Sequence, residues 1–167
     1  GKIFYNNAKI SSIGLTQIAC VMGPCVAGGA YLPVMCDKYI ITEGSNMFLA
    51  APALVKAAIG QVVDAETLGG ATTHSSISGI ADYHEKSDID SLSRIKSIVK
   101  NINFHSKKIF NKISTKNPKY DFENLFNYID TDNQSQYDIR EVIVRLTDDS
   151  LFDEYKKNYG KTIVCGH

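Results

Sequence analysis

Short apolar runs alternate with segments of helical apolar spacing along the first part of the chain. The apolar runs predict strands at residues 16–22, 38–42 and 46–50. The predicted helices are residues 4–13, 26–36 and 52–59, a short one from Asp64 to Gly69-Gly70, and a long amphipathic one with Leu92, Ile95, Ile98, Val99 and Ile102 on one face. This alternation is typical of a layered α/β domain.

The later part of the chain is less regular. Residues 103–119 are rich in Ser, Lys and Asn and include Pro118, which predicts a linker. Residues 138–146 predict a second amphipathic helix with a buried stripe of Ile139, Val142, Ile143 and Leu146. A strand is predicted at residues 161–165.

The length of 167 residues is enough for one domain, or one and a fraction. The 18 basic and 18 acidic residues cancel, so no global field favours binding to nucleic acid or an anionic membrane. The longest weakly polar stretch, residues 18–35, is interrupted by glycines and prolines, which argues against a membrane span. No leader segment precedes the first predicted helix, and we expect a fragment of a longer protein.

The four cysteines and four histidines predict no metal site. Cys20, Cys25, Cys36 and Cys165 lack the C-x-x-C spacing of paired metal ligands. Three of the cysteines lie in apolar surroundings, which predicts buried reduced thiols and a reducing compartment rather than a catalytic cysteine. Of the scattered histidines, His74 has the best claim to function, although a hydrogen-bonded structural role is the favoured interpretation.

The distribution of glycines suggests that the functional site lies in the first half of the chain. Residues 1–83 hold 10 of the 12 glycines and only 9 of the 36 charged residues. In Gly23-Pro24-Cys25-Val26-Ala27-Gly28-Gly29-Ala30-Tyr31, a strand leads into a helix whose first N–H groups lack intrahelical partners. The small residues Gly28, Gly29 and Ala30 would let an oxygen approach those donors, which predicts an oxyanion hole. Close helix-on-sheet packing is an equally good explanation, and the G-x-G-x-x-G dinucleotide spacing is absent.

Several blocks, taken in order, resemble one family. The blocks are residues 23–37, 47–50, 54–58, 68–71 and 78–79, with Pro52, His74, and residues 1–8 and 137–143. They resemble the carboxyltransferase (β) subunits of biotin-dependent acyl-CoA carboxylases. Within that family the chain is most similar to the β subunits that act on 3-methylcrotonoyl-CoA.

The resemblance implies a crotonase-like (ClpP/crotonase) α/β spiral fold, present as an incomplete fragment. Residues 1–117 would be the C-terminal part of the N-terminal, acyl-CoA-binding domain with a linker, and residues 118–167 the start of the C-terminal domain. The implied reaction transfers a carboxyl group from carboxybiotin to 3-methylcrotonoyl-CoA in leucine breakdown. Biotin itself, after releasing CO2, is the base proposed for the family, so no catalytic side chain is required.

The resemblance also implies site residues and partners. Backbone donors at Gly28, Gly29 and Ala30 would be catalytic, and the acyl and pantetheine groups would lie along Phe48, Leu49, Ala50, Ala51, Pro52, Gly69, Gly70 and Ala71. The segments 48–52 and 69–71 could equally be tight turns of the scaffold. The implied partners are an acyl-CoA, an α subunit with biotin carboxylase and biotin carrier parts, and further β subunits, with no nucleic acid or membrane. The implied location is the mitochondrial matrix in a eukaryote and the cytoplasm otherwise.

Two alternatives stay open. A propionyl-CoA or acetyl-CoA carboxylase would share the same blocks, although residues 54–58 and 155–160 look more like the methylcrotonoyl type. The other alternative is a catalytically silent crotonase-like scaffold that binds acyl-CoA. Because the family's active site needs both domains, we expect the isolated fragment to be inactive.

Residues 91–120 contain Arg94 and seven lysines but no acidic residue. The lysines are Lys96, Lys100, Lys107, Lys108, Lys112, Lys116 and Lys119. A solvated helix face with a linker is the favoured interpretation. Docking of an acidic partner or of CoA phosphates is the second, and nucleic-acid binding the weakest, because no aromatic stacking platform is interleaved.

Overall fold

The computed structural model describes residues 1–102, 114–129 and 136–167. The chain forms two compact units. The first comprises residues 1–102 with 158–160, and the second comprises residues 103–157 with 161–167. Most of the predicted linker, residues 103–113, lies outside the described residues. All of the predicted site residues belong to the first unit.

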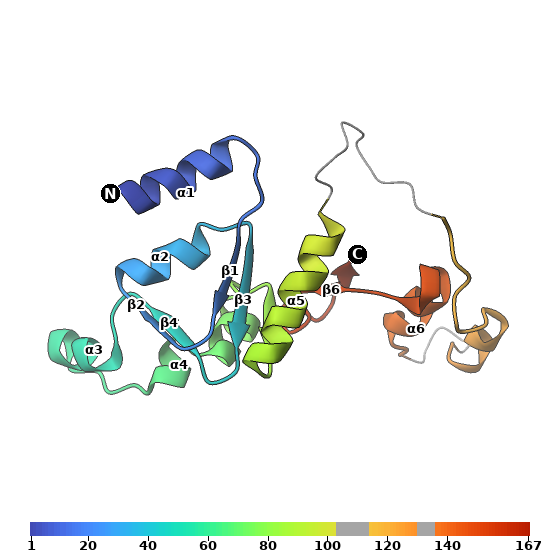
Figure 1. Ribbon diagram of the computed structural model, residues 1–167. Helices are drawn as coiled ribbons and strands as arrows, with labels where there is room; N and C mark the ends of the chain where they lie inside the picture. The colour runs from blue at the N-terminus through green and yellow to red at the C-terminus, as the bar shows by residue number, and fades with distance from the viewer. Residues whose placement is uncertain (103–113, 130–135) are drawn as a thin grey trace. The chain divides into compact units, whose positions relative to one another are not determined.

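A three-stranded parallel sheet forms the centre of the first unit (Figure 1). Its strands are β1 (Ile18–Val21), β3 (Lys38–Thr42) and β5 (Tyr83–Glu85), in the order β1-β3-β5. The predicted strands at 16–22 and 38–42 are confirmed, the first of them shortened at both ends. Strand β5 was not predicted. Within the described residues, β1 lies at one edge of this sheet.

The two faces of β3 pack against different helices. Tyr39 and Ile41 join a core cluster with Ala30 of helix α2 (Gly28–Val34). Thr42 faces the other way, and its hydroxyl lies 2.8 Å from that of Ser91 on helix α5 (Asp88–Asn101). Because side chains alternate across a strand, α2 and α5 cover opposite faces of the sheet (Figure 1).

A second, two-stranded parallel sheet joins β2 (Pro24–Val26) to β4 (Asn46–Phe48), with Val26 opposite Phe48. The predicted helix at 26–36 is therefore wrong at its start, because the chain stays extended through Val26. Pairing with β4 holds Val26 in the extended backbone that its β-branched side chain favours, and it outweighs the helix propensity of the neighbouring Ala27. Pro24, which has no N–H, takes the first position of the strand, where proline is tolerated.

The remaining helices of the first unit match the predicted ones closely. They are α1 (Lys2–Ser12), α3 (Pro52–Ile59) and α4 (Ala65–Gly69), with a π-helical turn, η1 (Thr73–Ile77), that was not predicted. Helix α3 begins at its proline and ends at Gly60, whose φ of 72° is left-handed. Asp64 caps α4 by accepting a 2.9 Å hydrogen bond from the Thr67 N–H.

The second unit contains short elements. They are two 3-10 turns, η2 (Glu123–Asn127) and η3 (Asp148–Ser150), the helix α6 (Ile139–Leu146), and an antiparallel pair of strands, β6 (Glu154–Tyr155) and β7 (Cys165–Gly166). The predicted helix at 138–146 is confirmed, with Asp138 as its N-cap. The predicted strand at 161–165 is reduced to its last residue. Among the helices in the described ranges, none is both long and apolar enough to cross a membrane.

The buried stripe predicted for α6 is wrong, because Val142 and Ile143 are only half-buried and the two ends are exposed. Ile139 is 41% exposed and Leu146 is 66% exposed. The buried residue is Arg145, whose guanidinium lies 4.7 Å from the ring centre of Tyr128 and 5.6 Å from that of Tyr120. The hydrogen bond from Arg145 to the Glu141 carboxylate raises the pKa of the guanidinium.

Candidate functional site

The turn between β2 and α2 has an unusual backbone conformation. Ala27, at the helix N-cap, has φ 55° and ψ −123°, a region that residues with a side chain rarely adopt. Two hydrogen bonds hold it there. Its N–H donates to the Phe48 carbonyl at 3.0 Å, and its carbonyl accepts from the Ala30 N–H at 3.0 Å. Strained backbone of this kind persists only where the surrounding structure enforces it, and it is found mainly at functional sites.

The Ala27 turn leaves two adjacent backbone donors free. In the described part of the chain, the N–H groups of Gly28 and Gly29 have no hydrogen-bond partner, and both residues are exposed. The Ala30 N–H is already used in the bond to Ala27. The three predicted donors are therefore reduced to two. We call residues 27–29 the oxyanion turn, after the role that the sequence predicts for the donors.

The space around the oxyanion turn is open. A Cβ atom built on Gly28 would have nothing within 4 Å, and one on Gly29 would lie 3.6 Å from Sγ of Cys25, an ordinary contact distance. Folding therefore does not require glycine at either position. Their missing side chains instead leave room for a ligand oxygen to approach the two donors.

Residues 69–71 pack against β4. Gly70 forms an isolated antiparallel bridge with Asn46, and all three residues are buried. A Cβ atom on Gly69 would lie 2.3 Å from the Met47 carbonyl oxygen, so only glycine fits at this position. The contacts of Gly69, Gly70 and Ala71 in this structure are thus those of a scaffold turn.

Residues 48–52 continue directly from β4. The carbonyl of Phe48 holds the oxyanion turn, and Leu49 is 56% exposed. Ala50 and Ala51 are half-buried, and Pro52 begins α3. The structure therefore brings Phe48 to the oxyanion turn, and Leu49 presents the largest exposed apolar side chain between β4 and α3.

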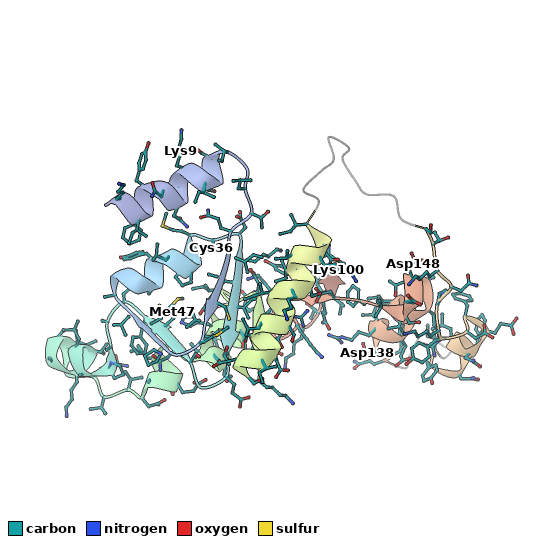
Figure 2. All side chains as sticks on the ribbon, viewed as in Figure 1. Lys9, Cys36, Met47, Lys100, Asp138 and Asp148 are labelled. Atoms are coloured by element: carbon teal, nitrogen blue, oxygen red, sulfur yellow. The ribbon has the colours of Figure 1, made fainter. Side chains whose placement is uncertain are left out.

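His74 is buried against β4. Its Nε2 lies 2.7 Å from the Met47 carbonyl oxygen and its Nδ1 lies 3.1 Å from the Ser78 hydroxyl. Met47, labelled in Figure 2, is a core residue of β4. Both ring nitrogens have partners, as predicted for a structural histidine.

The cysteines are free thiols. Cys20, Cys25 and Cys36 are half-buried, and Cys165 is exposed. Burial raises the pKa of the Cys20, Cys25 and Cys36 thiols, so they stay protonated near neutral pH. A protonated thiol is a poor nucleophile. Over the described residues, no three His, Cys, Asp or Glu side chains cluster in a way that could hold a metal ion.

Some of the basic residues of 91–120 are used in ion pairs. Arg94 Nε lies 2.7 Å from a carboxylate oxygen of Glu85, and Lys116 Nζ lies 2.8 Å from one of Asp149. Lys107, Lys108 and Lys112 lie outside the described residues. The hydrogen bond that Lys116 donates to Asp149 lowers the pKa of the Asp149 carboxyl. These contacts agree with a solvated surface.

Sequence reasoning missed Ala27, the residue that turns the two donors outward. Alanine is a good helix former, and nothing local distinguishes a strained N-cap from the first turn of a helix. The one available signal was Val26, a β-branched residue that favours extended backbone.

Known proteins are similar to this chain in sequence and in fold. The carboxyl transferase domain matches residues 1–167. The mitochondrial methylcrotonoyl-CoA carboxylase beta chain of Arabidopsis thaliana is 43% identical, over 99% of this chain and 30% of the relative. The biotin-dependent 3-methylcrotonyl-coenzyme A carboxylase beta1 subunit of Mycobacterium tuberculosis is 41% identical, over 98% of this chain and 31% of the relative. The chain thus spans about a third of the length of these relatives.

A solved structure gives the same result. The transcarboxylase 12S structure, a hexamer with methylmalonyl-coenzyme A and methylmalonic acid bound, superimposes with a TM-score of 0.86 and 29% identity, over 99% of this chain and 32% of the other. The expected crotonase-like α/β fold is confirmed. With matching sequence along its whole length and the matching fold, this chain belongs to the carboxyl transferase domain family.

Proposed function

We propose that this chain is part of a carboxyltransferase subunit that carboxylates 3-methylcrotonoyl-CoA. The product would be 3-methylglutaconyl-CoA, formed in leucine breakdown. Residues 1–117 would belong to the acyl-CoA-binding domain with its linker, and residues 118–167 would begin the second domain. The observation that carries the proposal is the pair of free donors at the exposed residues Gly28 and Gly29, in a chain that belongs to the carboxyl transferase domain family. We infer that its reaction passes through an enolate.

The oxyanion turn would act on the thioester oxygen. When a proton leaves the γ carbon of the acyl group, the electron pair delocalises through the double bond onto this oxygen. Two backbone donors already aimed at that oxygen stabilise the charge without reorganising, and the loss of one such donor typically costs about 10²-fold to 10³-fold in kcat. The carbanion then forms a bond to CO2 at the γ carbon.

Neighbouring residues would position the acyl group. Leu49, which follows the Phe48 that holds the turn, is exposed, and the half-buried residues 50–52 lead from it into α3. An acyl chain and the pantetheine that follows could lie along this apolar backbone. The turn at residues 69–71 would support the site by packing against β4. We also propose that Gly69, Gly70 and Ala71 contact the acyl or pantetheine group.

Biotin would arrive on a partner. Carboxybiotin supplies the carboxyl group and, once CO2 has left, the base. The free donors at Gly28 and Gly29 fit one oxyanion, which we assign to the thioester, and we assign no described residue to biotin. The proposed partners are therefore an α subunit that carries biotin and further β subunits. In a eukaryote the location would be the mitochondrial matrix, as for the Arabidopsis thaliana relative.

The methylcrotonoyl substrate is favoured over a smaller acyl group. Identity is 43% and 41% to two relatives named for methylcrotonoyl-CoA, against 29% to the transcarboxylase with methylmalonyl-coenzyme A bound. A difference of a few carbons in an apolar pocket is worth about 1 to 3 kcal/mol per group.

Carboxylation of matched thioesters tests the proposal. The complete subunit that contains this chain is assembled with its biotin-bearing partner, and kcat/KM is measured with 3-methylcrotonoyl-CoA and propionyl-CoA. The expected preference for 3-methylcrotonoyl-CoA is about 10-fold or more. Equal values would contradict the methylcrotonoyl assignment, and no turnover of either thioester, with calorimetric binding retained, would favour the silent scaffold instead.

A further inference from the structure

The outer edge of β4 faces away from its only strand partner in the described residues. Asn46 N–H donates to the Gly23 carbonyl and the Phe48 carbonyl accepts from Ala27, so the polar groups of Asn46 and Phe48 face β2. Backbone polar groups alternate along a strand, so the Met47 carbonyl points to the opposite edge. A buried carbonyl at that edge needs a donor.

His74 supplies this donor. Because a carbonyl can only accept, the 2.7 Å contact with Met47 requires the hydrogen of His74 on Nε2. The backbone of His74 is fixed at the same time, since its N–H donates to the Gly70 carbonyl and its carbonyl accepts from the Ala81 N–H. The imidazole therefore completes the hydrogen bonding of this edge of β4, beside the bridge between Gly70 and Asn46. It does so from a π-helical turn, an uncommon element that is frequent at functional sites.

The hydrogen bond from His74 to Met47 is connected to the oxyanion turn through the next residue of β4. Met47 is followed by Phe48, and the Phe48 carbonyl holds the Ala27 N–H at 3.0 Å. Ala27 is the strained residue whose φ of 55° turns the Gly28 and Gly29 donors outward. Strained backbone must be held by its neighbours, so a shift of β4 would release the turn.

We propose that His74 is a positioning residue for the oxyanion turn, acting by holding the Met47 carbonyl and thereby the β4 edge that fixes Ala27. This inference rests on the proposed function for its effect on turnover. Its effect on the backbone is independent of any reaction. His74 touches no reacting atom and needs to donate only one hydrogen bond, from the position of Nε2.

Two variants of similar polarity separate the two bonds of His74. In His74→Gln the side-chain amide can reach the Nε2 position and keep the bond to Met47. In His74→Asn the shorter side chain places its amide near Nδ1, where it can reach Ser78 but not Met47. Ser78→Ala is the third variant, since it removes only the Nδ1 partner.

The variants are compared in the complete subunit assembled with its biotin-bearing partner. We expect kcat within about threefold of wild type for His74→Gln and Ser78→Ala, and at least about tenfold lower for His74→Asn, because a displacement of about 1 Å at a site can cost on the order of 10²-fold. KM for the thioester should change less than about twofold, because the donors bind the transition state more strongly than the substrate. Hydrogen exchange of the Ala27 amide should speed up in His74→Asn alone.

The outcomes separate the inference from the proposed function. If His74→Gln and His74→Asn are alike in kcat and in Ala27 exchange, the positioning role is wrong. If Ser78→Ala is as impaired as His74→Asn, packing of η1 rather than the Met47 bond is responsible, and the inference also fails. A wild-type protein without carboxyl transfer would overturn the proposed function only, and the exchange of Ala27 would then decide the inference by itself.

Discussion

The N–H of Ala27 donates to the carbonyl of Phe48 across the ends of two parallel strands. This bond fixes a residue with a side chain at φ 55°, and the two amides that follow are left free. The proposed site is thus made of backbone groups, and its geometry depends on the pairing of β2 with β4 rather than on a reactive side chain.

Relief of the strain at Ala27 should stabilise the protein. Strain of this kind costs on the order of 1 to 3 kcal/mol, and glycine gives back part of the gain through its greater freedom in the unfolded chain. We therefore expect Ala27→Gly to raise the free energy of unfolding by about 1 kcal/mol in urea denaturation. Ala30→Gly, at a buried helical position, is the control and should lower it by about 1 kcal/mol. A loss of stability in Ala27→Gly would show that the conformation is not strained.

Gly69 and Gly28 should respond in opposite ways to an added methyl group. In Gly69→Ala the new Cβ meets the Met47 carbonyl at 2.3 Å, which is backbone and cannot move away cheaply. We expect a loss of about 1 to 3 kcal/mol in the free energy of unfolding. Gly28→Ala places its Cβ in open space and should unfold at nearly the wild-type urea concentration. Similar midpoints for the two variants would contradict this account of the Gly69 contact.

The thiols should differ in reactivity. Burial raises the pKa of Cys20, Cys25 and Cys36, so a smaller fraction of each is thiolate at pH 8 than in an exposed cysteine. Alkylation with iodoacetamide, followed by peptide mapping, should modify the exposed Cys165 at least about tenfold faster than these three. The same mapping in urea is the control, since all four should then react at similar rates. Fast modification of Cys25 in the folded protein would contradict the raised pKa.

The Asp64 cap should contribute to stability only when it is ionised. Hydrogen bonds from the Thr67 hydroxyl and N–H lower its pKa in the folded protein. Because the pKa is lower in the folded protein, the ionised carboxylate stabilises the fold at pH values above the unfolded pKa of about 3.9. This contribution is lost as the pH falls through the folded pKa. Thermal unfolding of Asp64→Ala should therefore show a deficit at pH 7 that shrinks as the pH falls through and below 4. A deficit that stays constant from pH 7 to pH 2 would contradict this linkage.

The parts of the fold that the sequence predicted well have local causes. Helix α3 is marked by Pro52 at its start and Gly60 at its end, and α4 by the capping carboxylate of Asp64. The predicted donors at Gly28 and Gly29 also follow from a local pattern, a strand leading into small residues. These features need no knowledge of distant partners.

The parts that were missed depend on distant contacts. The extended conformation of Val26 comes from pairing with Phe48, and the burial of Arg145 from the rings of Tyr120 and Tyr128 on another segment. The use of the Ala30 N–H follows from the φ of Ala27, which propensity does not give. Tertiary partners of this kind override weak local preferences.

A bulky side chain at the oxyanion turn tests the central claim most directly. Gly29→Val would place a branched group beside the two donors, and its Cβ would make only an ordinary contact with Cys25. Ala8→Val, at an exposed position of α1, is the matched control. In the assembled carboxylase we expect kcat for 3-methylcrotonoyl-CoA to fall about 10²-fold or more in Gly29→Val, with an unchanged unfolding midpoint, and to be unchanged in Ala8→Val. Wild-type turnover by a folded Gly29→Val enzyme would contradict the claim that these backbone amides stabilise the enolate.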